Sequence, residues 1–308
     1  MKAIVQDKYG TADVLRQAEI AQPQPAEGQV LVRVLATGVD RGVVHLMTGL
    51  PYLVRLGFGL TRPRIAVRGQ DLAGIVEAVG PGVTGFKPGD EVCGSGTGTF
   101  AEYAIARQDR LVAKPARLSF AEAAALPVSG VTALDGVGTL HEGQRVLVTG
   151  AGGGVGSFVL QIAAAQGAEV TAVCGPGKAE FVRSLGATHV VDYTRQDVTG
   201  RYDLVVDLAG NRPLRVARGI TEPAGRLVIL GGENGGRLTG GFQRQIGLHL
   251  VAPFVRQKLT APLALVRQEP LRRLVKLVED GTVTPAVTRT YPLAEAAEAV
   301  RHVEAGHA

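Results

Sequence analysis

A glycine-rich turn between a strand-like and a helix-like segment constrains the fold more than any other feature of the sequence. Residues 145–150 read RVLVTG, a short β-branched run, and an apolar segment, VGSFVLQIAAAQG, follows the glycines. Glycine has no Cβ, so backbone N–H groups in such a turn approach an anion closely, and the next helix N-terminus adds partial positive charge. TGAGGGVGSF, residues 149–158, therefore predicts a pyrophosphate-binding strand–turn–helix. Ala151 replaces the first glycine of G-x-G-x-x-G, so a tight turn that binds nothing is the alternative.

The alternation of strand and helix continues through the middle of the chain. Expected strands lie at 145–150, 169–174, 189–193, 203–210 and 226–232, with helices at 179–185 and 214–220. Nearly continuous apolar strands suit a parallel sheet covered on both faces. Successive βα units at this spacing predict a doubly wound α/β fold.

The pattern after Gly232 is less regular. We expect a sixth strand at 250–256, a strand at 284–293 and a closing helix at 294–308. Between the two strands, EPLRRLVKLVEDG has helical spacing and a glycine stop. We expect one face of this helix to be buried and the helix to end at Gly281. The residues of that face are Leu271, Leu274, Val275 and Val278.

The N-terminal part of the chain has a different pattern of expected secondary structure. Short β-rich runs at 30–34, 73–79 and 91–93 are bounded by Gly and Pro, which favours an antiparallel, all-β region. Near Ser119 the pattern changes, because Ser119 and Glu122 form a capping-box sequence before a helical stretch. The chain therefore reads as two domains with the change at this point.

Charge and composition exclude several classes of protein. The net charge is +5 and only seven of the 33 cations are lysines, but the arginines are scattered and aromatic residues make up 5%. A nucleic-acid site would gather its cations and offer aromatic stacking partners, so we expect no specific nucleic acid. No apolar run reaches the ~18–20 residues of a membrane span, and the first ten residues lack the apolar core of a signal peptide. Two cysteines indicate no disulfide framework and a reducing, cytoplasmic setting.

The end of the second expected strand discriminates between dinucleotides. An NAD site usually carries an acid there for the ribose hydroxyl, whereas this strand ends at Cys174 and no carboxylate follows before Glu180. Lys178 offers a cation for a 2′-phosphate, and Tyr193 offers a phenolic hydrogen bond. NADP(H) is therefore expected rather than NAD(H), with an exposed helix-start lysine as the alternative interpretation.

Several motifs resemble one family along almost the whole chain. They are MKAIV, the spacing GxDxxGxVxxVGxGVxxFxxGDxV from Gly69 to Val92, FAEY at 100–103, LPVSGVTA at 126–133, VLVTGAGGGVG and SLGATHVVDY. This set resembles the medium-chain dehydrogenase/reductase superfamily, in its zinc-independent quinone oxidoreductase and enoyl reductase branch. The resemblance implies a GroES-like, mostly antiparallel β domain at 1–118 and 265–308. It also implies a Rossmann domain with a doubly wound parallel sheet at 119–264.

The resemblance also bears on metal binding. Zinc alcohol dehydrogenases of the superfamily carry Gly-His-Glu where this chain has Gly69-Gln70-Asp71, and their first cysteine ligand falls near Val39 and Asp40. Zinc prefers tetrahedral sets of Cys and His, and two distant cysteines with six unpatterned histidines supply none. We therefore expect no metal, and no Lewis acid to polarise an alcohol.

The candidate site residues follow from the motifs and the resemblance. Gly152, Gly153, Gly154, Val155 and Gly156 are expected to hold the pyrophosphate, Lys178 and Tyr193 the 2′-phosphate, and Thr132, Gly231 and Gly232 the nicotinamide. Tyr52 resembles the tyrosine of enoyl reductases that donates a proton. Asp40 replaces the family's asparagine, and His45 is a possible substrate contact; the expected catalytic residues are therefore Tyr52, Asp40 and His45. Purely structural roles for Tyr52 and His45 stay open.

The sequence thus predicts an NADPH-dependent, zinc-independent reductase of activated double bonds in a quinone, enone or enoyl thioester. We expect a hydrophobic small-molecule substrate and a homodimer. Reduction of a carrier-bound acyl chain would use the same site. The alternative is a cofactor-binding protein with little catalysis that acts as a redox-responsive or nucleic-acid-binding partner.

Overall fold

The computed structural model describes residues 1–232, 236–263 and 265–306. Its contacts divide the chain into two compact units, Met1–Val131 with Leu265–Ala308, and Thr132–Ala264. The first division falls inside a helix, whereas the sequence pattern changes at Ser119. The domain limits of 118/119 and 264/265 stay a proposal.

The first unit is built on a five-stranded antiparallel sheet in the order β6-β3-β4-β5-β7. Its strands are β3 (Gln29–Ala36), β4 (Asp71–Val79), β5 (Glu91–Ser95), β6 (Tyr103–Arg107) and β7 (Leu111–Ala113). A separate antiparallel pair joins β1 (Lys2–Val5) and β2 (Arg16–Glu19). Val32, Leu72 and Val92 are fully buried in one apolar cluster of the five-stranded sheet. The expected antiparallel β domain is confirmed.

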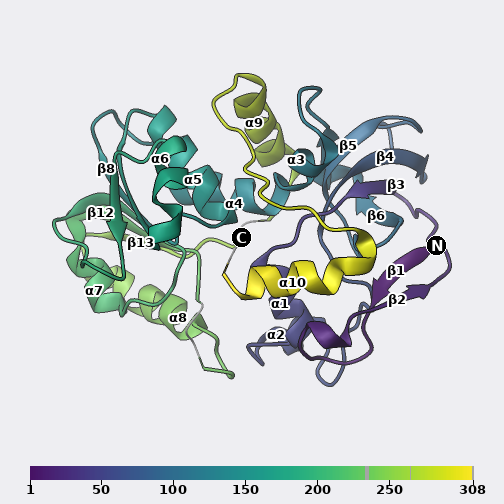
Figure 1. Ribbon diagram of the computed structural model, residues 1–308, viewed down its shortest axis with the longest axis horizontal. Helices are drawn as coiled ribbons and strands as arrows, with labels where there is room; N and C mark the ends of the chain where they lie inside the picture. Colours follow the sequence, from purple (N-terminus) through teal and green to yellow (C-terminus); the bar gives the residue numbers. More distant parts are fainter. Residues whose placement is uncertain (233–235, 264, 307–308) are drawn as a thin grey trace. The chain divides into compact units, whose positions relative to one another are not determined.

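Helices of the first unit come from both ends of the chain (Figure 1). They are α1 (Arg41–Thr48), α2 (Val54–Phe58), α3 (Phe120–Ala124), the first residues of α4 (Pro127–Val137), α9 (Gln268–Glu279) and α10 (Ala296–Glu304). Helix α10 contacts α1, and Arg117 Nη1 donates a hydrogen bond to the Val278 carbonyl oxygen at 2.7 Å. The C-terminal residues therefore complete the N-terminal unit.

The capping box before α3 forms as the sequence predicts. The Glu122 backbone N–H donates to Ser119 Oγ at 3.3 Å, and the Ser119 backbone N–H donates to Glu122 Oε2 at 2.8 Å. Helix α9 stops as expected before Gly281, whose φ of +76° suits glycine. Leu271, Leu274 and Val278 are fully buried on its inner face.

The second unit contains a six-stranded parallel sheet in the order β10-β9-β8-β11-β12-β13. The strands are β8 (Arg145–Thr149), β9 (Glu169–Cys174), β10 (His189–Asp192), β11 (Tyr202–Asp207), β12 (Thr221–Ile229) and β13 (Lys258–Thr260). In chain order this is 3-2-1-4-5-6, which is the Rossmann arrangement, and the order reverses at β8. The doubly wound parallel sheet is confirmed.

Helices cover both faces of this sheet (Figure 1). Helices α5 (Gly154–Ala165) and α6 (Ala179–Ser184) pack along β8, β9 and β10, whereas α7 (Leu214–Gly219) and α8 (Phe242–Val251) pack along β12 and β13. Short 3-10 turns lie at Ala12–Val14, Gln108–Arg110, Pro176–Lys178, Ala252–Phe254 and Leu293–Glu295.

Two strand predictions are wrong. Residues 250–256 continue α8 into a 3-10 turn, and the sixth strand begins at Lys258. Leu248, Val251, Ala252 and Val255 repeat at helical spacing and pack on one cluster, which explains the helix. Residues 284–293 form no β-ladder in the part of the chain that the structure describes, and Pro285 and Pro292 lack the N–H that a ladder needs.

The remaining expected elements lie within a few residues of their predicted positions. Strand β12 is the exception, because it begins at Thr221 and not at the predicted residue 226. Thr221 pairs with Tyr202 before an irregularity in the register of the two strands. The closing helix is confirmed to Glu304, and residues 307–308 of that prediction lie outside the described residues.

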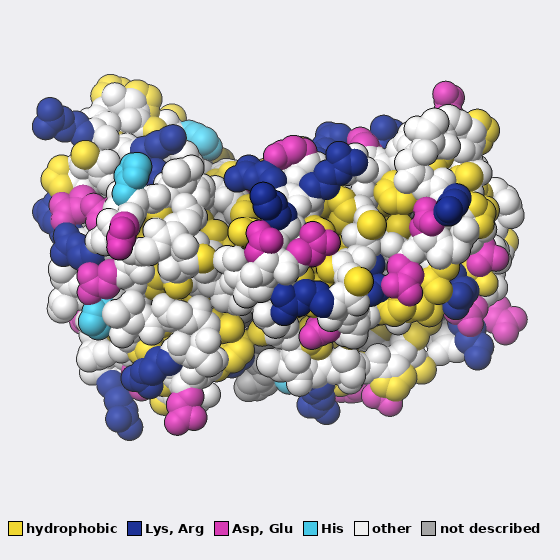
Figure 2. All heavy atoms as spheres, turned by 90° about the horizontal axis from the view of Figure 1, so that it is seen from above, with side chains coloured by type: hydrophobic (Ala, Val, Ile, Leu, Met, Phe, Trp, Pro, Cys, Tyr) yellow, Lys and Arg dark blue, Asp and Glu magenta, His cyan; other side chains and the backbone are white. Residues whose placement is uncertain are grey.

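The surface carries both signs of charge. On the face seen in Figure 2, lysine and arginine side chains are interspersed with acidic ones, as the scattered arginines of the sequence predict. Among the helices that the structure describes, none has the length and apolar character needed to cross a bilayer.

Candidate functional site

The glycine turn joins the end of β8 to the start of α5. Gly150 has a φ of +70°, which other residues rarely adopt. A Cβ on Gly156 would lie 2.5 Å from the Ala151 carbonyl oxygen, so the first turn of the helix packs directly on the loop. Gly153 caps α5, and a Cβ there would meet one atom within 4 Å, the Gly150 oxygen at 3.6 Å. The Gly153 N–H donates to the Gly150 oxygen at 3.2 Å, so the N–H groups of Gly154, Val155 and Gly156 in the first helical turn are the ones available to an anion.

Ala151 explains the departure from G-x-G-x-x-G. Its side chain is fully buried, and its backbone N–H donates to the Val173 oxygen at 3.2 Å. A methyl group fits into the core at this position, so the turn keeps its shape without the first glycine of the motif.

Lys178 lies against the same turn. Its Nζ donates a hydrogen bond to the Gly152 carbonyl oxygen at 3.1 Å and lies 5.5 Å from the centre of the Phe181 ring. Partial burial lowers the pKa of the lysine. A cation is therefore held at the end of β9, next to the phosphate-binding geometry of the turn.

Tyr193 approaches this point from the next strand. A Cβ on Gly175 would lie 3.6 Å from the Tyr193 hydroxyl oxygen, and the tyrosine side chain is exposed. Asp192, the nearest acid at the end of β10, accepts hydrogen bonds from the backbone N–H and hydroxyl of Thr194 at 2.9 and 2.7 Å. These bonds lower the pKa of Asp192 and turn its carboxylate toward its own loop. The structure thus places Lys178 against the glycine turn and Tyr193 beside Gly175, at the end of β9.

A buried polar cluster at the end of β11 was missed by the sequence analysis. Asp207 is 1% exposed, and its Oδ1 accepts hydrogen bonds from Thr149 Oγ1 at 2.6 Å and from the Gly210 N–H at 3.0 Å. Its Oδ2 accepts from Arg244 Nη2 at 2.5 Å. Arg244 Nε and Nη1 are buried and have no hydrogen-bond partner among the described residues.

This cluster lies where the strand order reverses, because Thr149 ends β8 and Asp207 ends the neighbouring β11. The carboxylate in the apolar segment DLVVDLAG was the available signal, since a charge that ends a buried strand needs a partner.

Gly231 and Gly232 follow the end of β12. A Cβ on Gly231 would lie 1.7 Å from the Leu208 carbonyl oxygen, so packing of the two chain segments alone requires glycine there. Thr132 is half-buried on α4. A nicotinamide-contacting role for these three residues stays a prediction.

The three expected catalytic residues lie in the first unit, and each makes a contact within the fold. Asp40 caps α1, accepting a hydrogen bond from the Val43 N–H at 2.8 Å, and burial raises the pKa of its carboxyl. The His45 ring Nδ1 lies 2.9 Å from the Leu50 carbonyl oxygen. The Arg55 guanidinium lies 4.7 Å from the centre of the Tyr52 ring.

Asp71 is a second buried acid near Asp40. Its Oδ2 accepts from the Val128 N–H at 3.3 Å, and its Oδ1 is buried without a hydrogen-bond partner among the described residues. Burial raises the pKa of Asp71 well above its usual value, and the negative charge of Asp40 adds to that shift. In the sequence Asp71 marks a family motif and a missing zinc ligand, and neither indicates that its carboxyl is buried.

Within the described ranges, no three His, Cys, Asp or Glu side chains gather in a way that could hold a metal ion. The zinc-independent chemistry stays a prediction.

A Rossmann-type parallel sheet and a GroES-like antiparallel sheet in one chain define the class of two-domain dehydrogenases and reductases. Residues 26–116 match the alcohol dehydrogenase GroES-like domain, and residues 185–308 match the zinc-binding dehydrogenase domain. The chain belongs to the medium-chain dehydrogenase/reductase superfamily, in its quinone oxidoreductase branch.

Individual relatives resemble the chain over its whole length. It is 31% identical to the chloroplast envelope quinone oxidoreductase homolog of Arabidopsis thaliana, covering 100% of this chain and 96% of that protein. It is 32% identical to the NADPH-dependent alkenal/one oxidoreductase of the same plant, covering 100% and 78%. A mycobacterial protein solved in complex with NADPH superposes with a TM-score of 0.84 at 27% identity, covering 100% of this chain and 97% of that one.

Proposed function

We propose that this protein is an NADPH-dependent oxidoreductase that reduces an activated carbon–carbon double bond in a quinone, enone or enoyl thioester, without zinc. The observation that carries the proposal is the contact of Lys178 with the glycine turn, while Tyr193 lies beside Gly175 at the end of β9 and Asp192 is engaged by Thr194. A 2′-phosphate needs a cation and no opposing carboxylate, and this arrangement offers both. The named activities of the relatives support the same class of reaction.

The residues present fit such a dinucleotide. The N–H groups of Gly154, Val155 and Gly156 suit the pyrophosphate, because they lie in the first turn of α5 and the glycines at 152–154 carry no side chain. Lys178 and Tyr193 would bind the 2′-phosphate, and Thr132, Gly231 and Gly232 would line the nicotinamide. When bound, NADPH supplies the hydride; the protein has to orient both reactants and stabilise the developing negative charge.

Residues of the first unit would act on the substrate. Tyr52 carries an exposed phenol, 39% accessible, whose ring is held by Arg55, so it is suited to donate a proton to a reduced substrate. Asp40 and His45 would contact polar substrate atoms in addition to their bonds within the fold. Without zinc, a substrate whose double bond is already polarised is the chemically reasonable one.

The cofactor proposal is tested by titrating NADPH and NADH against wild type, Lys178→Ala and Tyr193→Phe. Loss of a charge-assisted contact should weaken NADPH binding about tenfold in Lys178→Ala and leave NADH binding nearly unchanged. Lys258→Ala, an exposed lysine of the same unit, is the matched control. Tighter binding of NADH by wild type, or unaltered NADPH binding in Lys178→Ala, would contradict the proposal.

The chemistry is tested with a panel of quinones, enones, enoyl thioesters and alcohols, each with and without added zinc. We expect turnover of the activated double bonds in the presence of a chelator, and a lower kcat in Tyr52→Phe. Activity on alcohols alone, and only with zinc, would overturn the reaction class. Because Asp40, His45 and Tyr52 all make contacts within the fold, a cofactor-binding protein with little catalysis is the second candidate. Tight NADPH binding without turnover of any substrate would establish it.

A homodimer in the cytoplasm is part of the same proposal. Strand β13 ends the parallel sheet, and two large apolar side chains near it, Phe254 and Leu263, are 86% and 84% exposed. Cys93 and Cys174 are free and buried, as suits a reducing compartment. Light scattering should give a dimer mass for wild type and a monomer mass for Phe254→Glu with Leu263→Glu.

A further inference from the structure

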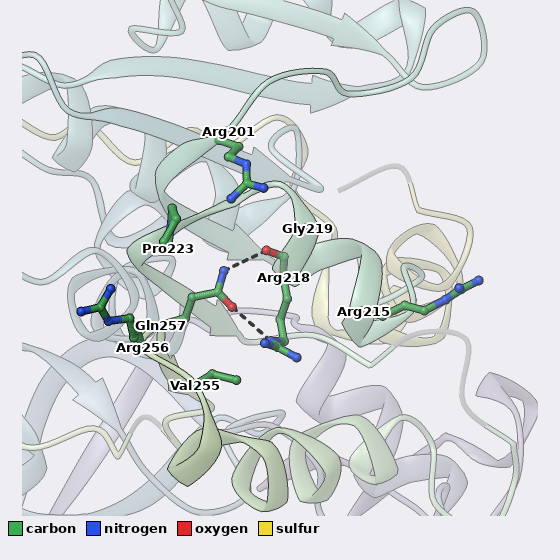
Figure 3. A pocket seen from close by; sticks show the side chains of 8 residues that line it. All are labelled: Arg201, Arg215, Arg218, Gly219, Pro223, Val255, Arg256 and Gln257. Atoms are coloured by element: carbon green, nitrogen blue, oxygen red, sulfur yellow. Dashed lines mark hydrogen bonds between the residues drawn. The ribbon is translucent and has the colours of Figure 1, made fainter.

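A hollow with a volume of about 430 Å³ opens in the second unit (Figure 3). Its lining comes from the loop before β11, helix α7, the start of β12 and the loop before β13. These segments lie at the amino ends of the parallel strands, whereas the glycine turn follows the carboxyl end of β8. The hollow therefore lies at the opposite edge of the sheet from the proposed dinucleotide site.

Half of the residues that line this hollow are arginines, and none of the lining residues is acidic. The four are Arg201, Arg215, Arg218 and Arg256. Within the described part of the chain, none of them forms an ion pair. The acid nearest in sequence to the lining, Glu222, accepts a hydrogen bond from Arg145 Nη2 at 2.7 Å. Among the described residues, the four arginines are therefore not paired with an acid.

One guanidinium is held in place. Arg218 Nε donates to Gln257 Oε1 at 3.0 Å, and Gln257 Nε2 donates to the backbone oxygens of Arg218 and Thr221 at 2.9 and 3.0 Å. The backbone acceptors fix the orientation of the amide, so its oxygen faces the guanidinium (Figure 3). This bond uses Nε and leaves the terminal nitrogens of Arg218 to bind an anion.

The other arginines are arranged around this fixed pair. Arg201 reaches toward the hollow from the loop before β11, whereas the side chains of Arg215 and Arg256 extend outward on opposite sides of it (Figure 3). Planar guanidinium groups bind phosphate oxygens through paired N–H donors, and several of them suit a ligand with more than one phosphate. The volume is within the range of small-molecule sites.

We propose that this hollow binds a small anion with two or more phosphate groups, separately from the dinucleotide. Arg218 and Gln257 form the fixed part of the site, and Arg201, Arg215 and Arg256 supply adaptable charge. The exposed, arginine-rich lining suits a hydrophilic ligand such as a nucleoside diphosphate or a sugar bisphosphate. The proposal does not depend on the reductase activity.

Inorganic pyrophosphate is the probe, titrated by calorimetry into the full-length protein at fixed ionic strength, with and without saturating NADPH. With NADPH saturating the glycine turn, we expect one saturable pyrophosphate site. Arg218→Gln should weaken pyrophosphate binding about tenfold, since it removes a charge-assisted donor pair. Arg195→Gln, an exposed arginine after β10 whose side chain is 82% accessible, is the matched control and should bind as wild type does.

If Arg218→Gln fails to fold, the test uses a double variant of the two loop arginines, Arg201→Gln with Arg256→Gln. This variant should also weaken pyrophosphate binding about tenfold. The proposal is overturned by absence of saturable binding, by equal weakening in Arg195→Gln, or by binding that the hollow variants leave unchanged. Displacement of pyrophosphate by NADPH would assign it to the glycine turn instead. None of these outcomes requires that the protein reduce any substrate.

Discussion

The buried ion pair between Asp207 and Arg244 should be one of the strongest single determinants of stability in the second unit. Asp207→Asn keeps an oxygen that accepts from the Thr149 hydroxyl and the Gly210 N–H, so two of the three hydrogen bonds survive. It removes the negative charge and places an amide donor opposite Arg244 Nη2. The variant therefore isolates the charge pair.

The magnitude follows from burial. The side chains of Asp207 and Arg244 are 1% and 13% exposed, so the arginine charge left in the variant is poorly hydrated. Breaking a buried pair by removing one partner costs about 3–5 kcal/mol. Since about 1 kcal/mol shifts the Tm of a protein of 150–250 residues by roughly 2–4 °C, we expect a fall of the order of 10 °C.

A double-mutant cycle provides the assay. Urea unfolding of wild type, Asp207→Asn, Arg244→Met and the double variant gives the coupling energy between the two side chains. The double variant removes the uncompensated charge, so its loss should be smaller than the sum of the single losses by about 2 kcal/mol or more. Single variants that each cost under about 1 kcal/mol and add without coupling would refute the reasoning.

Three further predictions follow from other groups. Because burial raises the pKa of Asp71 in the folded state, that state binds more protons above about pH 4, and this group makes stability fall as pH rises. Asp71→Asn should therefore gain stability relative to wild type between about pH 4 and pH 8 in urea unfolding, and a constant difference would contradict this. Burial raises the pKa of Cys93 to about 12 and also raises that of Cys174, so neither thiol should react with a disulfide reagent near pH 8 until the protein unfolds; rapid labelling of the native protein would disprove it. Ser119→Ala should cost about 1 kcal/mol through loss of the capping box, and Ser184→Ala, which ends α6, should cost less; equal costs would exclude a capping role.

Strands of the second unit could be predicted from the sequence because each is a continuous apolar run bounded by a turn. Strand β9 begins and ends at the predicted residues, 169 and 174. The prediction failed at 250–256, where a short apolar run has no strand partner of its own and its buried residues repeat at helical spacing instead. Length and composition alone do not separate these two cases.

Some residues of the candidate site could likewise be predicted from the sequence, and others could not. Lys178 and Tyr193 were expected near the glycine turn because each follows a strand of the same parallel sheet, and carboxyl ends of parallel strands meet at one edge. Arg244 gave no such signal, because it lies 37 residues from Asp207 on a helix and no strand register relates the two. The carboxylate of Asp71 likewise accepts a hydrogen bond from a residue distant in sequence, the Val128 N–H, 57 residues away. Contacts of this kind require the tertiary structure.

The arginine hollow changes the interpretation of the positive charge, which appears diffuse in the composition. Arg218 lies in the last turn of α7, where a cation is favourable by about 0.3–1 kcal/mol because it faces the negative end of the helix dipole. That effect explains one cation at this helix end. Arg201 and Arg256 lie in loops before β11 and β13, outside any helix, and bringing them close to Arg218 costs energy through like-charge repulsion. A bound polyanion offsets that repulsion, whereas helix capping does not. Because Arg201, Arg215 and Arg256 are exposed, water screens part of this repulsion, and the pyrophosphate titration decides whether a ligand uses the remaining charge.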